Sequence, residues 1–279
     1  MPLTACLSGH GTLDATLDGL GAGMAWEAVY RVQPRPVLAC TDCGLPMHAK
    51  VSGRGGRFFA HDRRSSTCAA VGETEEHRAL KRALAAAARE AGHRVELEAR
   101  AAHGGWRADL LVTAPSGART ALEAQVSSAS VDDVLERTRR YQDDGLGVVW
   151  FTHRAARWLD RVPAARLYRP AGPDGPDGPD GPDGPFSRLH PLVRRFSVVA
   201  CAEVCDPSPF WHGPIHVGWD HGEERDVPQF VAAVLHGHLV PRTATTALGT
   251  RYDGWAAPED VTAADEYAAS TRTTPPAPV

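Results

Sequence analysis

The chain has 279 residues and a mass of 29.9 kDa, which is enough for one large domain or two modest ones. Hydrophobic residues make up 43% and charged residues 23%, so a wholly disordered or collagenous chain is excluded. No run approaches the roughly 18 apolar residues of a membrane span, and the N-terminus lacks the basic start and apolar run of a signal peptide. We therefore expect a cytoplasmic protein without a membrane span.

The formal net charge of -4 is unevenly distributed along the chain. Residues 1–49 carry 2 basic and 4 acidic side chains, residues 50–169 carry 21 and 15, and residues 170–279 carry 7 and 15. A polyanionic partner such as nucleic acid therefore fits only the middle of the chain. The same arginines also suit a solvated face, so charge alone does not decide between these readings.

The N-terminal part combines weak periodicity with a pattern typical of a metal site. Residues 1–35 form a poorly defined segment whose one strand-like run is 28–32, and residues 36–70 are short, glycine-rich and carry Cys and His. Six cysteines without a secretion signal indicate metal rather than disulfides. The spacing favours a closed, structural zinc site with the ligands Cys40, Cys43, His61 and Cys68.

Two alternatives stay open at this predicted zinc site. His48 competes with His61 as the histidine ligand, and the cysteines can also be reduced thiols in a half-buried strand. Cys6 stands alone and indicates nothing.

Residues 71–170 predict an α/β domain in the order helix, three strands, helix, strand. The first helix has acidic residues in its first turn and a glycine after its end, and a Pro-Ser-Gly turn joins the last two of the three strands into a hairpin. The second helix starts at a Ser cap. The expected ranges are 73–91, 94–98, 107–113, 119–126, 130–143 and 146–151.

A GPD repeat divides the chain near residue 170. The Gly-Pro-Asp run over 172–185 has no apolar side chains to bury, so we expect residues 171–186 to form an extended, solvated linker. Beyond it we expect a small acidic C-terminal domain over 187–265, with a strand over 195–201 and a helix over 226–237, and a flexible tail over 266–279.

The C-terminal part also contains a second set of potential metal ligands. Cys201 and Cys205 precede His212 and His216 at metal-like spacings, but the loop of six residues between the pairs is short for a zinc site. We expect these residues to pack rather than to bind metal.

Acidic residues in the central domain point to chemistry on phosphodiesters. Glu76 precedes Leu80 by one helical turn and is expected on the buried face, Asp109 lies among apolar strand residues, and Glu123 and Gln125 share a face of the next strand. Taken singly, each acid can simply be an ion-pair partner of an arginine. Together, converging carboxylates repel unless a cation such as Mg²⁺ or Mn²⁺ joins them, and such an ion assists phosphodiester hydrolysis.

Several spaced motifs give the central part a family resemblance. The runs at 76–81, 106–110, 123–128, 137–141 and 149–151 resemble the competence protein CoiA family over roughly residues 38–152. The resemblance implies an α/β (α+β) fold, with a restriction-endonuclease-like PD-(D/E)xK core of mixed sheet flanked by helices and a small zinc-binding segment. It also implies a role with DNA in uptake, recombination or repair.

Within this resemblance, Asp109 and Glu123 match the two metal-binding acids, and Glu76 matches the helical acid, with Glu73 and Glu75 as close alternatives. Gln125 stands where the nuclease superfamily usually has lysine, and it can position water only through hydrogen bonds. Lys81 is a candidate substitute, although a lysine there is also the usual solvated helix residue.

Two principal hypotheses follow for the function. The first is a deoxyribonuclease that uses Mg²⁺ or Mn²⁺ with Asp109, Glu123, Glu76, Gln125 and Lys81 on single- or double-stranded DNA without base specificity. The second is a catalytically weak or inactive DNA-binding accessory of recombination, working with a recombination protein. A third reading makes the acidic C-terminal part a protein-docking module.

Overall fold

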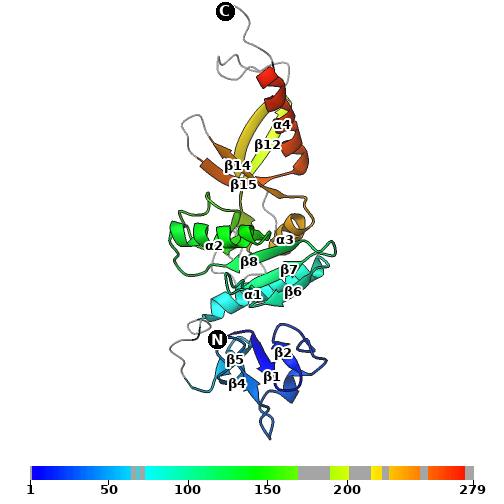
Figure 1. Cartoon of the computed structure of the whole chain (residues 1–279), viewed down its shortest axis with the longest axis vertical. Coiled ribbons are helices and arrows are strands. Elements are labelled where there is room, and N and C mark those ends of the chain that lie inside the picture. Colours follow the sequence, from blue (N-terminus) through cyan, green and yellow to red (C-terminus); the bar gives the residue numbers. More distant parts are fainter. Residues whose placement is uncertain are drawn as a thin grey trace, which may run out of the picture.

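The computed structural model describes residues 2–63, 68, 73–168, 189–200, 215–221, 226–245 and 251–273. Three sheets follow one another along the longest axis of the molecule, with the N-terminal sheet at one end and the C-terminal sheet at the other (Figure 1). The predicted GPD linker, Cys201, Cys205 and His212 lie outside the described residues, and of His216 only the backbone is described, in a strand.

The N-terminal sheet is antiparallel and has the order β2-β1-β3-β4-β5. Its strands are Thr4–Leu7 (β1), Gly11–Asp14 (β2), Leu38–Ala39 (β3), Pro46–Val51 (β4) and Arg57–His61 (β5). The strand expected over 28–32 is wrong. Trp26–Ala28 instead forms a 3-10 turn (η1), which buries Trp26 and stacks it on Tyr30, so the apolar spacing there reflects aromatic packing.

The central sheet has the order β11-β10-β9-β8-β7-β6, and its β8–β9 and β9–β10 pairs are parallel. Its elements are α1 (Glu75–Glu90), β6 (Arg94–Leu97), β7 (Leu110–Thr113), β8 (Arg119–Ala124), α2 (Val131–Asp143), β9 (Gly147–Thr152), β10 (Ala164–Tyr168) and β11 (His190–Leu192). The expected order of helix, three strands, helix, strand is therefore confirmed, as is the mixed α+β fold class.

Both central helices begin at side-chain caps. The Thr74 hydroxyl accepts a hydrogen bond from the His77 amide, and the Ser130 hydroxyl accepts one from the Asp133 amide. Each cap satisfies an otherwise unpaired amide of the first turn, which explains why the helices start there.

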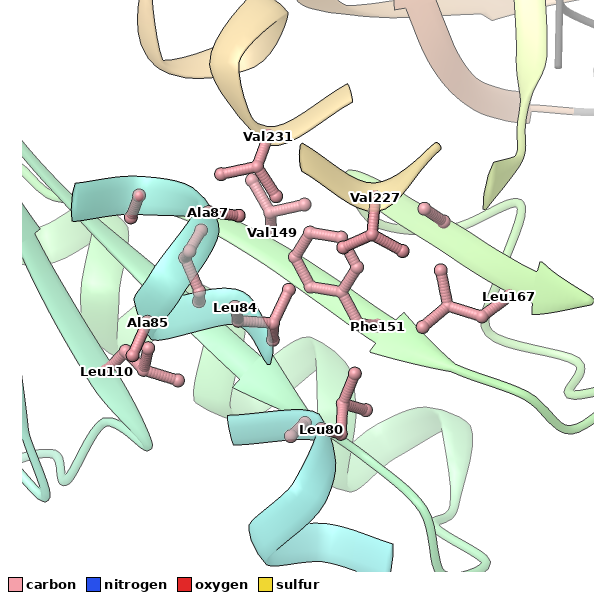
Figure 2. Packing of buried hydrophobic residues seen from close by; sticks show 14 of the residues in the cluster. Leu80, Leu84, Ala85, Ala87, Leu110, Val149, Phe151, Leu167, Val227 and Val231 are labelled. Carbon is pink, nitrogen blue, oxygen red and sulfur yellow. The ribbon is translucent and has the colours of Figure 1, made fainter. Parts of the chain in front are cut away.

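The C-terminal part joins the central core. Helix α3 (Val227–Leu235) packs along α1, and β11 extends the central sheet at β10. Figure 2 shows Val227 and Val231 of α3 together with Leu84 of α1 and Phe151 of β9. The segment that the sequence assigns to a separate unit thus helps to bury the central sheet.

The third sheet has the order β13-β12-β15-β14. Its strands are Arg194–Ala200 (β12), Ile215–His221 (β13), Val240–Thr245 (β14) and Arg251–Ala256 (β15), followed by α4 (Pro258–Thr273). Helix α4 corrects the flexible tail expected from residue 266, because the alanine-rich sequence favours a helix and Ala264 is buried near Phe196. Within the described residues, no helix is long and apolar enough to cross a membrane.

Removal of the Phe230 ring tests the shared core. Phe230 is 2% exposed and lies edge-on to Phe151 and Trp255, so Phe230→Ala should lower the free energy of unfolding by about 3–5 kcal/mol in urea denaturation. Leu135→Ala, at a residue that is 38% exposed, is the control and should change it little. Equal stability of the Phe230 variant and the parent would contradict the packing described.

Candidate nuclease and metal sites

Four ligands from the N-terminal sheet and the segment after it gather at one point. Cys40 follows β3, Cys43 lies in the tight turn before Gly44, His61 ends β5, and Cys68 approaches from the following segment. One ligand atom from each residue lies within 4.8 Å of the others. The four cysteines in the described part of the chain are free thiols, so no disulfide competes for this cluster.

The spacing of the cluster fits a tetrahedral ion. With Zn–S bonds of about 2.3 Å, two thiolates on one zinc are separated by about 3.8 Å. The Cys40 and Cys68 Sγ atoms are 3.7 Å apart, and Cys43 Sγ is 3.3 Å from His61 Nε2. The predicted Cys₃His set is thus assembled and can hold a metal such as zinc.

His48 does not belong to this set. Its Nδ1 lies within hydrogen-bond distance of Asp62 Oδ1, at 2.7 Å, so His61 is the histidine of the cluster. The ambiguity between the two histidines is thereby resolved.

Asp42 connects the cysteine cluster to the central domain. Its backbone amide donates to Cys40 Sγ over 3.4 Å, and its carboxylate accepts from the Cys68 thiol over 3.1 Å. The same carboxylate forms an ion pair with Arg100, which lies beyond β6. Burial raises the pKa of the Cys40 thiol, and a backbone hydrogen bond at Leu45 helps to lower the pKa of Cys43 against the effect of its own burial.

Asp109 and Glu123 lie on neighbouring strands of the central sheet. Asp109 directly precedes β7, and its Oδ2 accepts a hydrogen bond of 2.9 Å from the Ala124 amide in β8. Burial opposes ionisation of Asp109, but His77, Lys81 and the Ala124 amide together hold the pKa of this carboxyl well below its usual range. Asp109 therefore carries a negative charge at neutral pH.

Glu123 is 1% exposed and is hydrogen-bonded to Arg137 and to the hydroxyl of Tyr141. Burial and the nearby charge of Asp109 raise the pKa of Glu123 to about 7. Two adjacent carboxylates thus have opposite shifts, an arrangement common at catalytic and metal-binding sites.

Lys81 is fully buried in the middle of α1 and is surrounded by acids. Its Nζ lies 2.5 Å from Glu73 Oε1 and 3.9 Å from Asp109 Oδ1, and it forms an ion pair with Glu98. The solvated helix lysine considered from the sequence is therefore wrong. Charge balance explains the burial, because a lone ammonium in this position would be costly.

Glu76 does not face the buried side, so that expectation from the sequence is wrong. Its side chain is 47% exposed and lies 3.4 Å from His153 Nε2, just after β9. The helical stripe that buries Leu80 has its centre at His77 and Lys81, and Glu76 lies at the edge of this stripe. Among the described residues, no group of three carboxylates gathers as the cysteine cluster does.

Gln125 is placed after β8 with its amide engaged. Nε2 donates to the carbonyl oxygen and hydroxyl of Ser127, each over 3.0 Å, and Oε1 accepts from Arg137 over 3.2 Å. Arg137 also stacks on the Trp150 ring at 4.6 Å. Gln125 thereby helps to fix the arginine that holds Glu123.

The site also contains residues to which the sequence gives no role. His77 Nε2 lies 3.1 Å from Asp109 Oδ2, and Arg137 and Tyr141 hold Glu123, although all three stand in the motifs of the family resemblance. Glu98 also has no role in the sequence analysis, and it encloses Lys81 together with Glu73, which the sequence offers only as an alternative helical acid. A lysine on the apolar stripe of a helix was the available signal, because its charge requires buried acidic partners.

Comparison with known proteins agrees with this geometry. Residues 73–159 match the family model described as competence protein CoiA, nuclease-like domain. This segment is similar to the nuclease-like domain of competence protein CoiA. The resemblance seen in the sequence motifs is thus confirmed, and the matched range contains Asp109, Glu123, Lys81 and their partners. Comparison with curated proteins finds no match, and comparison with solved structures finds none either.

Loss of one cluster ligand should abolish metal binding. We expect elemental analysis to find one zinc per chain in the parent and none in Cys43→Ser, because three ligands leave the tetrahedral site open. Cys6→Ser alters a free thiol outside the cluster and should retain zinc. Full zinc content in the Cys43 variant would contradict the assignment.

The raised pKa of Glu123 predicts a pH-dependent stability. In the unfolded chain this carboxyl ionises near its ordinary pKa of 4.5, whereas in the folded protein it keeps its proton until about pH 7. The folded state therefore binds more protons between these values, and stability should fall as pH rises from about 5 to about 7. Urea midpoints should show this fall in the parent and a smaller one in Glu123→Gln; parallel profiles would contradict it.

Proposed function

We propose that the protein is a divalent-metal-dependent DNA nuclease of the CoiA type, acting on DNA in uptake, recombination or repair. The observation that carries the proposal is the pair of buried carboxylates, Asp109 and Glu123, with Lys81 beside the first of them. Their place inside a nuclease-like domain supports this reading.

Asp109 and Glu123 are the residues that would hold Mg²⁺ or Mn²⁺. Their oxygen donors suit a hard cation, and the charge of Asp109 opposes ionisation of Glu123, so a cation between them would relieve the repulsion. When bound, such an ion activates water and neutralises charge on the phosphate. Glu76 contacts His153, which follows the C-terminal end of β9, and its role as a further metal ligand stays a prediction.

Lys81 is our candidate for the positive charge that Gln125 cannot supply. Its Nζ is 3.9 Å from Asp109 Oδ1, and its ion pairs with Glu73 and Glu98 offset the cost of burying it. A fixed cation beside the reacting phosphate stabilises charge that develops in the transition state. Gln125 would position water only after its amide leaves Ser127, so we assign to it first the positioning of Arg137.

One observation favours the alternative of a DNA-binding accessory that does not cut. Glu123 is covered by Arg137 and Tyr141, so a metal must displace the guanidinium before this carboxylate can bind it. If the ion pair prevails, the domain would hold DNA without hydrolysing it. In either case the cysteine cluster would hold structural Zn²⁺, and DNA would be the partner.

Cleavage of labelled single- and double-stranded DNA tests the proposal. Zinc-replete protein with Mg²⁺ or Mn²⁺ should cut, and Asp109→Asn and Glu123→Gln should each reduce the rate by about 100-fold or more, because each removes a negative ligand without changing side-chain size. Product lengths would separate internal from terminal cutting.

Glu96→Gln is the matched control for this assay. Glu96 is an exposed acid on β6, the edge strand beside β7, and its variant should cut at the parent rate. Absence of cutting by the parent, together with retained DNA binding, would replace the nuclease with the accessory protein.

A further inference from the structure

A pocket of about 650 Å³ opens beside the candidate nuclease site. It lies at the carboxyl ends of the parallel strands β8 and β9, where the chain leaves β8 toward α2 and leaves β9 through Thr152. Ligands of open α/β sheets bind at this edge, because loops from adjacent strands diverge there. The pocket has not been given a role by the nuclease proposal.

The charge of the pocket is one-sided. Arg154 and Arg157 line it and are exposed, and none of the lining residues is acidic. Among the described residues, neither guanidinium has a carboxylate partner. The nearest acids along α2, Asp132 and Asp133, lie outside the lining.

The remaining polar wall supplies hydrogen-bond donors. Ser127 Oγ accepts from the Gln125 amide, which leaves its own hydrogen free to donate, and Ser128 beside it is exposed. Ser130, by contrast, is committed to the cap of α2 and donates to Asp133 over 2.6 Å. Hydroxyls and guanidinium groups without acids are a typical environment for a phosphate.

Two contacts tie this pocket to the carboxylates. Arg154 Nε donates to the Val126 carbonyl oxygen over 2.6 Å, which fixes the guanidinium at the end of β8 and leaves its terminal nitrogens available. Gln125 joins Ser127 of the pocket to Arg137, the partner of Glu123. A DNA strand with one phosphate in the pocket would therefore continue toward Asp109 and Glu123.

We propose that this pocket binds a phosphate group of the DNA strand next to the phosphate at the carboxylate pair. Arg154, Arg157 and Ser127 would hold it through charge and hydrogen bonds, without reading a base. This inference rests on the proposed action on DNA, and it assigns the pocket to a backbone phosphate of the substrate.

Binding measured without cleavage tests the pocket. Fluorescence anisotropy of labelled oligonucleotides, with zinc-replete protein and no added divalent metal, should show Arg154→Ala/Arg157→Ala at least tenfold weaker than the parent. The slope of log affinity against log salt should also decrease by about 1–2, as expected for two lost phosphate contacts. Thermal unfolding should change little, since both side chains are exposed and water can replace the Arg154 hydrogen bond to the Val126 carbonyl.

Arg119→Ala is the matched control, because Arg119 is exposed at the opposite end of β8. Its affinity and slope should equal those of the parent. Unchanged binding in the double variant, or an equal loss in Arg119→Ala, would overturn the proposal.

Oligonucleotides with a 5′-phosphate or a 5′-hydroxyl distinguish two sources of the phosphate. A loss confined to the phosphorylated probe would support a pocket for the strand end, and a loss on both would support an internal phosphodiester. The readout is independent of cutting. If the protein binds DNA through Arg154 and Arg157 but never cleaves it, the phosphate pocket is supported and the nuclease proposal is contradicted. If it cleaves DNA but binds equally well without these two arginines, the nuclease proposal stands and the pocket is contradicted.

Discussion

The burial of the Lys81 ammonium is the constraint on which the nuclease-like domain depends. Desolvating this charge is costly, and three carboxylates from three separate places compensate it: Glu73 before α1, Glu98 at the end of β6 and Asp109 before β7. The ion pairs therefore fix the helix over the edge of the sheet. They also help to hold Asp109 ionised at the position where we propose that Mg²⁺ or Mn²⁺ binds.

The second acid of the pair is controlled from the other helix. Arg137 and Tyr141 lie one turn apart on α2 and both contact Glu123, while Trp150 on β9 supports the guanidinium. One carboxylate is thus held charged by α1 and the other is held partly protonated by its burial against α2. Under the proposed function, a cation that entered between them would relieve their repulsion after displacing the Arg137 guanidinium from Glu123.

The Asp42 carboxylate links the cysteine cluster to the central domain. It accepts a hydrogen bond from the Cys68 thiol and pairs with Arg100. An isolated β-bridge joins Arg100 to Arg107, and Arg107 in turn pairs with Glu98. Metal binding at the cluster would therefore stabilise the orientation of the N-terminal sheet against the domain that carries Lys81.

Local signals predicted the parts of the fold that depend on local physics. The caps at Thr74 and Ser130 and the Cys-x₂-Cys turn each act within a few residues, and the structure agrees with the helices and the cluster predicted from them. The packing of α3 on α1 depends on residues more than 130 positions apart, as the contact of His236 with Ala91 illustrates. No local sequence pattern predicts such a contact.

The candidate site was predictable only in part for the same reason. Asp109 and Glu123 stand out as acids within apolar strands, but helical periodicity alone could not tell the edge of the buried stripe, where Glu76 lies, from its centre at His77. The partners of Glu123 come from a different helix. Their geometry follows from how α2 packs on the sheet, which the sequence pattern does not specify.

The most direct test uses the fact that Lys50 and Lys81 are the two lysines of the chain. In protein labelled with ¹³C at lysine Cε, a titration with Mg²⁺ should shift the Lys81 resonance saturably and leave that of exposed Lys50 unchanged, because the proposed metal site includes Asp109, beside Lys81. The shift should vanish in Asp109→Asn. If the chemical shift of Lys81 in the parent did not change with Mg²⁺, or changed only as much as that of Lys50, the account would be contradicted.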